Sequence, residues 1–164
     1  MAWKSTYSGK YTVKNKKKYA GDPTKVKYRS LWERNAMRWF DGNPAIVRWN
    51  SEEVVVPYKC NTDGKWHRYF IDMMIEQSNG DIILVEIKPQ KQTIPPKNPK
   101  RKTKKYLNEV SAYIKNTSKW TYAQEYAKSR GWKFQIWTEH TLKNIGVKMI
   151  NESPKKMPKK KPYK

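Results

Sequence analysis

Asp81-Ile82-Ile83-Leu84-Val85-Glu86-Ile87-Lys88 is an aliphatic run that contains one inner carboxylate, Glu86, and ends in one ammonium group, Lys88. A run of this kind predicts a β-strand that is buried on both faces. Because side chains alternate along a strand, Glu86 and Lys88 are expected on the same face. Buried charges are costly unless they are paired or bind a metal ion. The run therefore predicts a central strand whose two charged residues have a chemical role.

A second strand-like run covers residues 69–75, precedes a turn at residues 78–80, and carries one isolated acid, Asp72. Adjacent antiparallel strands can bring Asp72 and Glu86 to one divalent cation, with Lys88 beside them. Such a cluster suits phosphodiester hydrolysis, because the ion polarises the phosphate and lowers the pKa of a bound water, while the lysine positions that water or offsets charge. Hard oxygen ligands favour Mg²⁺ or Mn²⁺.

The alternative is structural, since Glu86 and Lys88 can form a same-face ion pair at the edge of a sheet. Edge strands usually alternate and carry several polar residues, whereas this run is aliphatic up to its acid. The pattern favours a central strand, and with it the functional interpretation.

A third acid, Glu33, lies in a segment with helical periodicity over residues 30–41. Ser30 is suited to be the N-cap, and Glu33 three residues later suits a capping box, which is a purely structural role. However, Glu33 shares a helix face with Ala36, Met37 and Phe40, the face expected to turn toward the core. An inward acid here can reach the strand carboxylates and bind the metal or orient its water.

The composition points to a nucleic-acid partner. Thirty-six Lys and Arg residues against fourteen Asp and Glu residues give a formal net charge of +22 over 164 residues. Neutralising a phosphate backbone is the commonest reason for such an excess. Binding to a membrane surface is disfavoured, because the sequence has no long apolar span, no apolar segment near Met1 and no clean basic amphipathic helix.

The basic residues are clustered, and the clusters define three regions. Residues 1–27 are expected to form a disordered or loosely packed basic arm, residues 28–150 the single folded domain, and residues 151–164 a disordered Lys/Pro tail. The proline-rich cationic segment at residues 89–105 is predicted to be an extended loop that leads into a helix. This loop is either a solvated surface segment or a DNA-binding segment beside the catalytic strand. The residues expected to contact DNA are Arg29, His67, Arg68, Lys91, Lys97, Lys100, Arg101, Lys102, Lys104 and Lys105.

The single Cys60 excludes an intramolecular disulfide and a multi-cysteine zinc site. The hydrophobic pattern predicts strands near residues 46–49, 53–58, 68–76, 82–88 and 133–138. It also predicts one or two helices over residues 104–115 and 118–130, ended by Gly131, and a short helix from residue 139. The expected class is α/β, in which an antiparallel meander carries the acids and the last strand joins the mixed sheet through a helical crossover.

These residues resemble the PD-(D/E)xK restriction-endonuclease-like superfamily, and within it the TnsA-like branch. The resemblance is carried by Tyr28-Arg29-Ser30-x-x-Glu33, by His67-Arg68-Tyr69-Phe70-Ile71-Asp72 and by Trp132-Lys133-Phe134-Gln135-Ile136-Trp137-Thr138-Glu139. It implies a mixed sheet flanked by helices, with Asp72 and Glu86 as ligands of Mg²⁺ or Mn²⁺, Lys88 as the catalytic lysine and Glu33 as the helix acid and a further ligand. Ile71 stands where the superfamily usually has proline.

Within this branch the chain resembles nucleases that tailed phages use in head completion. The resemblance implies an endonuclease that processes packaged DNA ends, has head or portal proteins as partners, and is found in the virion and in the host cytoplasm during assembly. Two other classes remain open: a non-catalytic DNA-binding protein, and a structural virion protein at the portal or the head-tail junction.

Overall fold

A four-stranded mixed sheet forms the centre of the computed structural model, which describes residues 8–148. Its strands, in spatial order, are β3 (Ile46–Ser51), β6 (Met73–Gln77), β7 (Ile82–Ile87) and β8 (Lys133–Trp137). β3, β6 and β7 are antiparallel neighbours, whereas β8 is parallel to β7. A parallel neighbour requires a crossover, which α2 (Lys104–Ser129) supplies as predicted.

The aliphatic run of residues 82–87 is β7, and its predicted central position is confirmed. It lies between β6 and β8, so it is not an edge strand. All its residues from Ile83 to Ile87 are buried. Its side chains alternate between the two faces of the sheet, each of which carries a hydrophobic cluster. One cluster contains Ile83, Val85 and Ile87, and the other contains Leu84. Glu86 therefore shares the face of Leu84.

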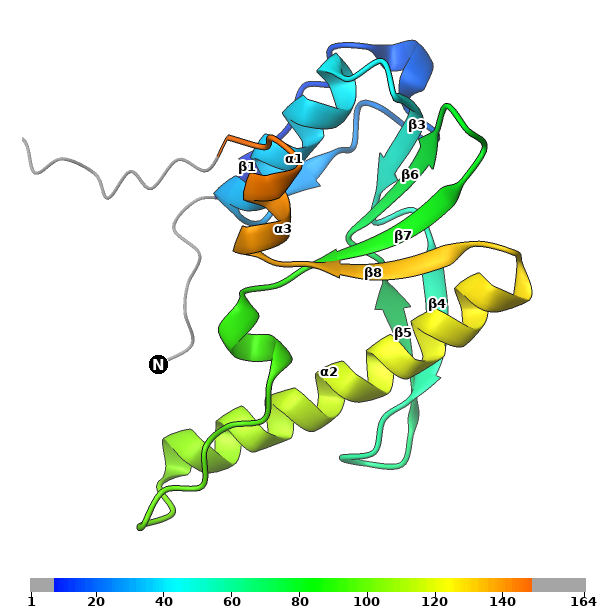
Figure 1. Cartoon of the computed structure of the whole chain (residues 1–164). Coiled ribbons are helices and arrows are strands. Elements are labelled where there is room, and N and C mark those ends of the chain that lie inside the picture. The colour runs from blue at the N-terminus through cyan, green and yellow to red at the C-terminus, as the bar shows by residue number, and fades with distance from the viewer. Residues whose placement is uncertain (1–7, 149–164) are drawn as a thin grey trace, which may run out of the picture.

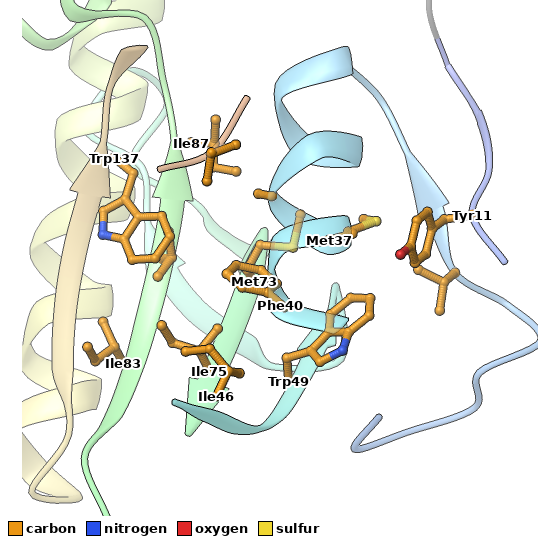
Figure 2. Packing of buried hydrophobic residues seen from close by; sticks show 14 of the residues in the cluster. Tyr11, Met37, Phe40, Ile46, Trp49, Met73, Ile75, Ile83, Ile87 and Trp137 are labelled. Carbon is orange, nitrogen blue, oxygen red and sulfur yellow. The ribbon is translucent and has the colours of Figure 1, made fainter. Parts of the chain in front are cut away.

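Helices cover both faces of the sheet. Helices α1 (Leu31–Gly42) and α3 (Glu139–Asn144) lie on one side, and α2 lies on the other (Figure 1). Met37 and Phe40 of α1 are fully buried against the first face, where Figure 2 shows them beside Met73, Trp49 and Ile75. The two helices that the sequence allowed over residues 104–130 are one continuous helix.

A separate hairpin, β4 (Val55–Lys59) and β5 (Trp66–Phe70), packs with α2 on the second face. The single strand predicted over residues 68–76 is therefore wrong: β5 pairs with β4, and β6 pairs with β3 and β7. The chain changes partners at Ile71 and Asp72. The sequence does not reveal such a change, because Tyr69 of β5 and Met74 of β6 are both buried in the cluster on the second face.

The basic N-terminal segment is packed, and the prediction of a disordered or loose arm is wrong for residues 8–27. It contains β1 (Gly9–Lys10), the 3₁₀ turn η1 (Lys16–Lys18) and β2 (Lys27–Tyr28). Between its lysines, apolar side chains enter the core of the first face; these are Tyr11, Val13, Tyr19 and Val26. The predicted tail at residues 151–164 lies outside the described residues.

Tyr11 shows how the segment is held. Its hydroxyl donates to Asp41 Oδ2 at 2.6 Å, and its ring meets Trp49 edge to face at 6.0 Å between centroids. Asp41 also accepts from the Trp49 indole at 3.2 Å. Burial and the Asp41 carboxylate raise the pKa of Tyr11, so it remains a donor.

Replacing Tyr11 with alanine should lower the free energy of unfolding by about 3–5 kcal/mol, because the change removes a buried aromatic ring. The exposed neighbour Thr12 provides the control: Thr12→Ala should change it by less than about 0.5 kcal/mol. Urea unfolding followed by tryptophan fluorescence measures both. Equal, small effects would show that the segment does not belong to the folding unit.

Candidate active site

Asp72 lies at the junction between the hairpin and the sheet, directly before β6. Its Oδ2 accepts a hydrogen bond from the backbone N–H of Ile87 at 2.9 Å. The register pairs Met73 with Val85, which places Asp72 beside Glu86 at the end of β7. The two acids therefore lie side by side, as predicted. The hydrogen bond from the Ile87 backbone N–H holds the Asp72 carboxylate against β7, the strand that carries Glu86.

Glu86 is buried, with only 5% of its surface exposed. Its Oε2 accepts a short hydrogen bond from the Tyr69 hydroxyl, and its Oε1 lies 3.6 Å from the Lys88 ammonium. Burial and the charge of Glu86 raise the pKa of Tyr69, so the phenol stays protonated and donates. The Glu86–Lys88 ion pair of the structural interpretation is thus present, but β7 is a central strand and not an edge strand. Glu86 also has a second partner, Tyr69 of β5.

The charge of Asp72 is strongly disfavoured in this surrounding. Withdrawal from solvent, with further contributions from Glu86 and Glu33, raises its pKa well above the ordinary value, and the Ile87 N–H and Lys88 only partly oppose this. Three carboxylates therefore interact at one end of β7. Such a cluster of desolvated anions calls for a compensating cation.

Glu33 reaches this cluster from the first turn of α1. The Ser30 hydroxyl accepts from the Glu33 backbone N–H at 3.2 Å, which confirms Ser30 as the N-cap. The Glu33 carboxylate, however, accepts from the Arg29 N–H at 2.9 Å rather than from Ser30, so the capping box is not formed. Burial, together with the charges of Glu52 and Glu86, raises the pKa of Glu33.

Glu52 and Tyr69 are site residues that the sequence argument missed. Glu52 has a left-handed φ of 55°, and its backbone N–H donates to the carbonyls of Ile71 and Asp72 at 3.2 and 3.3 Å. Its side chain forms a 2.9 Å ion pair with Arg29. The available signal was weak: an acid in the short gap between the strands predicted at residues 46–49 and 53–58, with nothing in the sequence to show that the chain turns back beside Asp72.

The predicted DNA contacts lie in several places, all of them exposed. Arg29 is beside Glu33 and Glu52. Lys91 lies in the 3₁₀ turn η2 (Gln90–Thr93), just after Lys88. His67 and Arg68 are on β5, where His67 bonds to Asp63 at 2.7 Å and Arg68 lies 5.7 Å from the ring centroid of Phe70.

The cationic segment at residues 89–105 follows β7 and extends into the N-terminal end of α2 (Figure 1). The predicted loop and helix are confirmed, with the first turn of α2 formed by the end of the cationic run. The loop lysines and arginine, Lys97, Lys100, Arg101 and Lys102, and the helix lysines Lys104 and Lys105, are exposed. Their contact with DNA remains a prediction.

The donor set fits a hard divalent cation. Among residues 8–148, no three His, Cys, Asp or Glu side chains form a complete metal cluster by themselves. Mg²⁺ is usually bound through one or two carboxylates and keeps waters and substrate phosphate oxygens as its other ligands. Asp72 and Glu86 match this pattern, and metal ligation by these two residues and by Glu33 remains a prediction.

Asp72→Asn should change how stability depends on pH in metal-free protein. The folded state binds the Asp72 proton more tightly than the unfolded chain does, so the protonated side chain contributes to the free energy of unfolding. This contribution is complete below about pH 4 and is lost as the pH rises through the raised pKa of the folded state. The variant should therefore gain stability over the parent chain with rising pH, measured by urea unfolding in EDTA. At Asp63, whose pKa is lowered chiefly by the Lys65 backbone N–H, Asp63→Asn should give the opposite trend. A pH-independent difference at position 72 would contradict the carboxylate interaction.

Comparison with known proteins agrees with this geometry. The family described as TnsA-like endonuclease N terminal matches residues 43–139, more than half of the chain and a range that includes Asp72, Glu86 and Lys88. The Head completion nuclease of Enterobacteria phage T4 is 47% identical over 146 residues, which cover 87% of this chain and 97% of that protein. No solved structure matches significantly. The chain belongs to the TnsA-like endonuclease family.

Proposed function

We propose that this protein is a DNA endonuclease that hydrolyses phosphodiester bonds with Mg²⁺ or Mn²⁺ as its cofactor. The observation that supports this most strongly is the meeting of Asp72, Glu86 and Lys88 at one end of a buried strand. The net charge of +22 gives the surface the attraction for phosphate that such an enzyme needs.

A divalent ion at this site would polarise the phosphate and lower the pKa of a bound water. Asp72 and Glu86 would hold the ion. The Ile87 N–H fixes the first carboxylate and the Tyr69 hydroxyl fixes the second, so the oxygens are positioned before substrate arrives. Lys88, whose side chain is 24% exposed, can turn its ammonium toward a water or toward developing charge on the phosphate.

The biological setting follows from the T4 relative, whose name assigns it to head completion. We propose the same setting for this protein: processing of packaged DNA ends before head-tail joining, with head or portal proteins as partners, in the host cytoplasm during assembly and in the virion. Within residues 8–148, no helix is long and apolar enough to cross a membrane.

A non-catalytic DNA-binding or structural virion protein explains the basic surface equally well. It does not explain the acids, because interacting carboxylates repel a phosphate unless a cation lies between them. Incubation of supercoiled and linear DNA with the purified chain, in Mg²⁺, Mn²⁺ or EDTA, separates the two functions. Nicking or cutting only with metal supports the nuclease, and intact DNA in every condition supports the alternative.

Asp72→Asn and Glu86→Gln should each abolish cleavage while DNA binding in EDTA stays equal or becomes tighter. The amide retains the shape of the side chain but loses the charge that holds a cation, and it also repels phosphate less. Gel-shift titration and plasmid nicking measure the two properties. Normal cleavage by either variant would rule out the assigned ligands.

Lys88→Ala should lower the cleavage rate at least about a hundredfold with little change in DNA affinity, the usual scale for one pre-organised electrostatic group. Lys88→Arg should not restore the rate, because the larger planar guanidinium does not take the position of the ammonium. Single-turnover cleavage and thermal melting are the measurements. A lower melting temperature with unchanged turnover would assign Lys88 to the structural ion pair alone.

A further inference from the structure

Lys119 brings a second ammonium group to the catalytic end of the sheet from a different element, α2. Its neighbours in sequence, Ser118 and Trp120, are buried, and Lys119 is half-buried on the face that covers the sheet and the hairpin. The ammonium lies 5.3 Å from the ring centroid of Tyr69 and 6.0 Å from that of Tyr58. Tyr69 is the residue that donates to Glu86, so one aromatic side chain separates Lys119 from the catalytic acid.

The charges of the site act on Lys119. Withdrawal from solvent lowers its pKa, Lys115 and Lys88 add to the lowering, and the charges of Glu86 and Asp72 oppose it. In the described part of the chain, no carboxylate lies within ion-pair distance of this ammonium. The Lys119 ammonium is thus partly buried, lies near the ring of Tyr69 and has no carboxylate close to it.

We propose that the Lys119 ammonium binds a phosphate of the DNA strand that the site cuts. This inference rests on the proposed nuclease function and adds a substrate contact to it. A partly desolvated ammonium is stabilised by an anion, and the two nearby acids are committed to Tyr69, to the Ile87 N–H and to the cofactor.

The placement of the two lysines also favours this role. Lys88 directly follows β7, and Lys119 lies on α2, so the two cations come to the acids from separate parts of the fold. A strand held by both is fixed relative to Asp72 and Glu86, which lowers the entropic cost of aligning the scissile bond. The face of Tyr69 keeps the Lys119 ammonium in place, since cations are attracted to aromatic faces.

The competing explanation is that the Lys119 stem only packs over the tyrosines. Lys119→Met separates the two, because methionine keeps most of the apolar stem and removes the charge. Lys128→Met, at an exposed position on the same helix, is the control for loss of one positive charge. Lys119→Arg retains the charge in case the methionine disturbs folding.

Binding of duplex DNA in EDTA is measured over a salt series, together with single-turnover cleavage in Mg²⁺ or Mn²⁺ and thermal melting. Lys119→Met should reduce the slope of log affinity against log salt by about one and lower cleavage about tenfold or more, with melting within about 2 °C of the parent chain. Lys119→Arg should retain the salt slope. Lys128→Met should alter cleavage less than about twofold.

The proposal is overturned if Lys119→Met binds and cleaves like the parent chain, if Lys128→Met produces equal losses, or if Lys119→Met lowers only the melting temperature. Failure of the parent chain to cleave with either metal would overturn the proposed function instead. The binding measurements in EDTA would still decide whether Lys119 contacts phosphate, so the two failures are distinguishable.

Discussion

Repulsion between carboxylates at the end of β7 is the constraint on which the rest of the structure depends. Burial and the charges of Glu86 and Glu33 raise the pKa of Asp72, and burial and the charges of Glu52 and Glu86 raise the pKa of Glu33, whereas Lys88 and Arg29 oppose these effects only in part. The Ile87 N–H bonds to Asp72, and the Tyr69 hydroxyl bonds to Glu86. Each of these donors is supplied by a specific element of the fold, so the fold holds in place an arrangement that the charges alone would disperse.

The hairpin β4–β5 has a clear place in this arrangement. The chain leaves the sheet after Glu52 and returns at Asp72, and the two residues are joined there by a backbone hydrogen bond of 3.3 Å. This excursion carries Tyr69 to the second face of the sheet, beside Glu86 and under α2. This hairpin, which forms a separate two-stranded sheet, therefore supplies the hydroxyl that fixes Glu86, a proposed metal ligand.

The hydrophobic and capping patterns of the sequence predicted those features of the fold that depend on residues close together in the chain. The aliphatic run gave β7, the alternation put Glu86 and Lys88 on one face, and the N-cap gave the start of α1. The features that could not be predicted depend on residues far apart in the chain. The change of strand partner at Ile71, the contact of Glu52 with Asp72 and the core position of Tyr11 are set by tertiary packing, which overrides local preference. The packing of the N-terminal segment could not be predicted either, because lysines dominate its composition while a few apolar residues determine its packing.

The opposite signs of the surface and the site have a physical consequence for order of binding. A chain with a net charge of +22 attracts DNA over a distance of about a Debye length, without regard to the acids. At contact distance the carboxylates repel the phosphate, and this repulsion is strongest where they are least solvated. In the proposed function, a cation at Asp72 and Glu86 would reverse the local sign of the charge and leave the long-range attraction nearly unchanged. Under the proposed function, loose capture by the basic surface and close approach to the acids would thus be separate steps, and only the second would require metal.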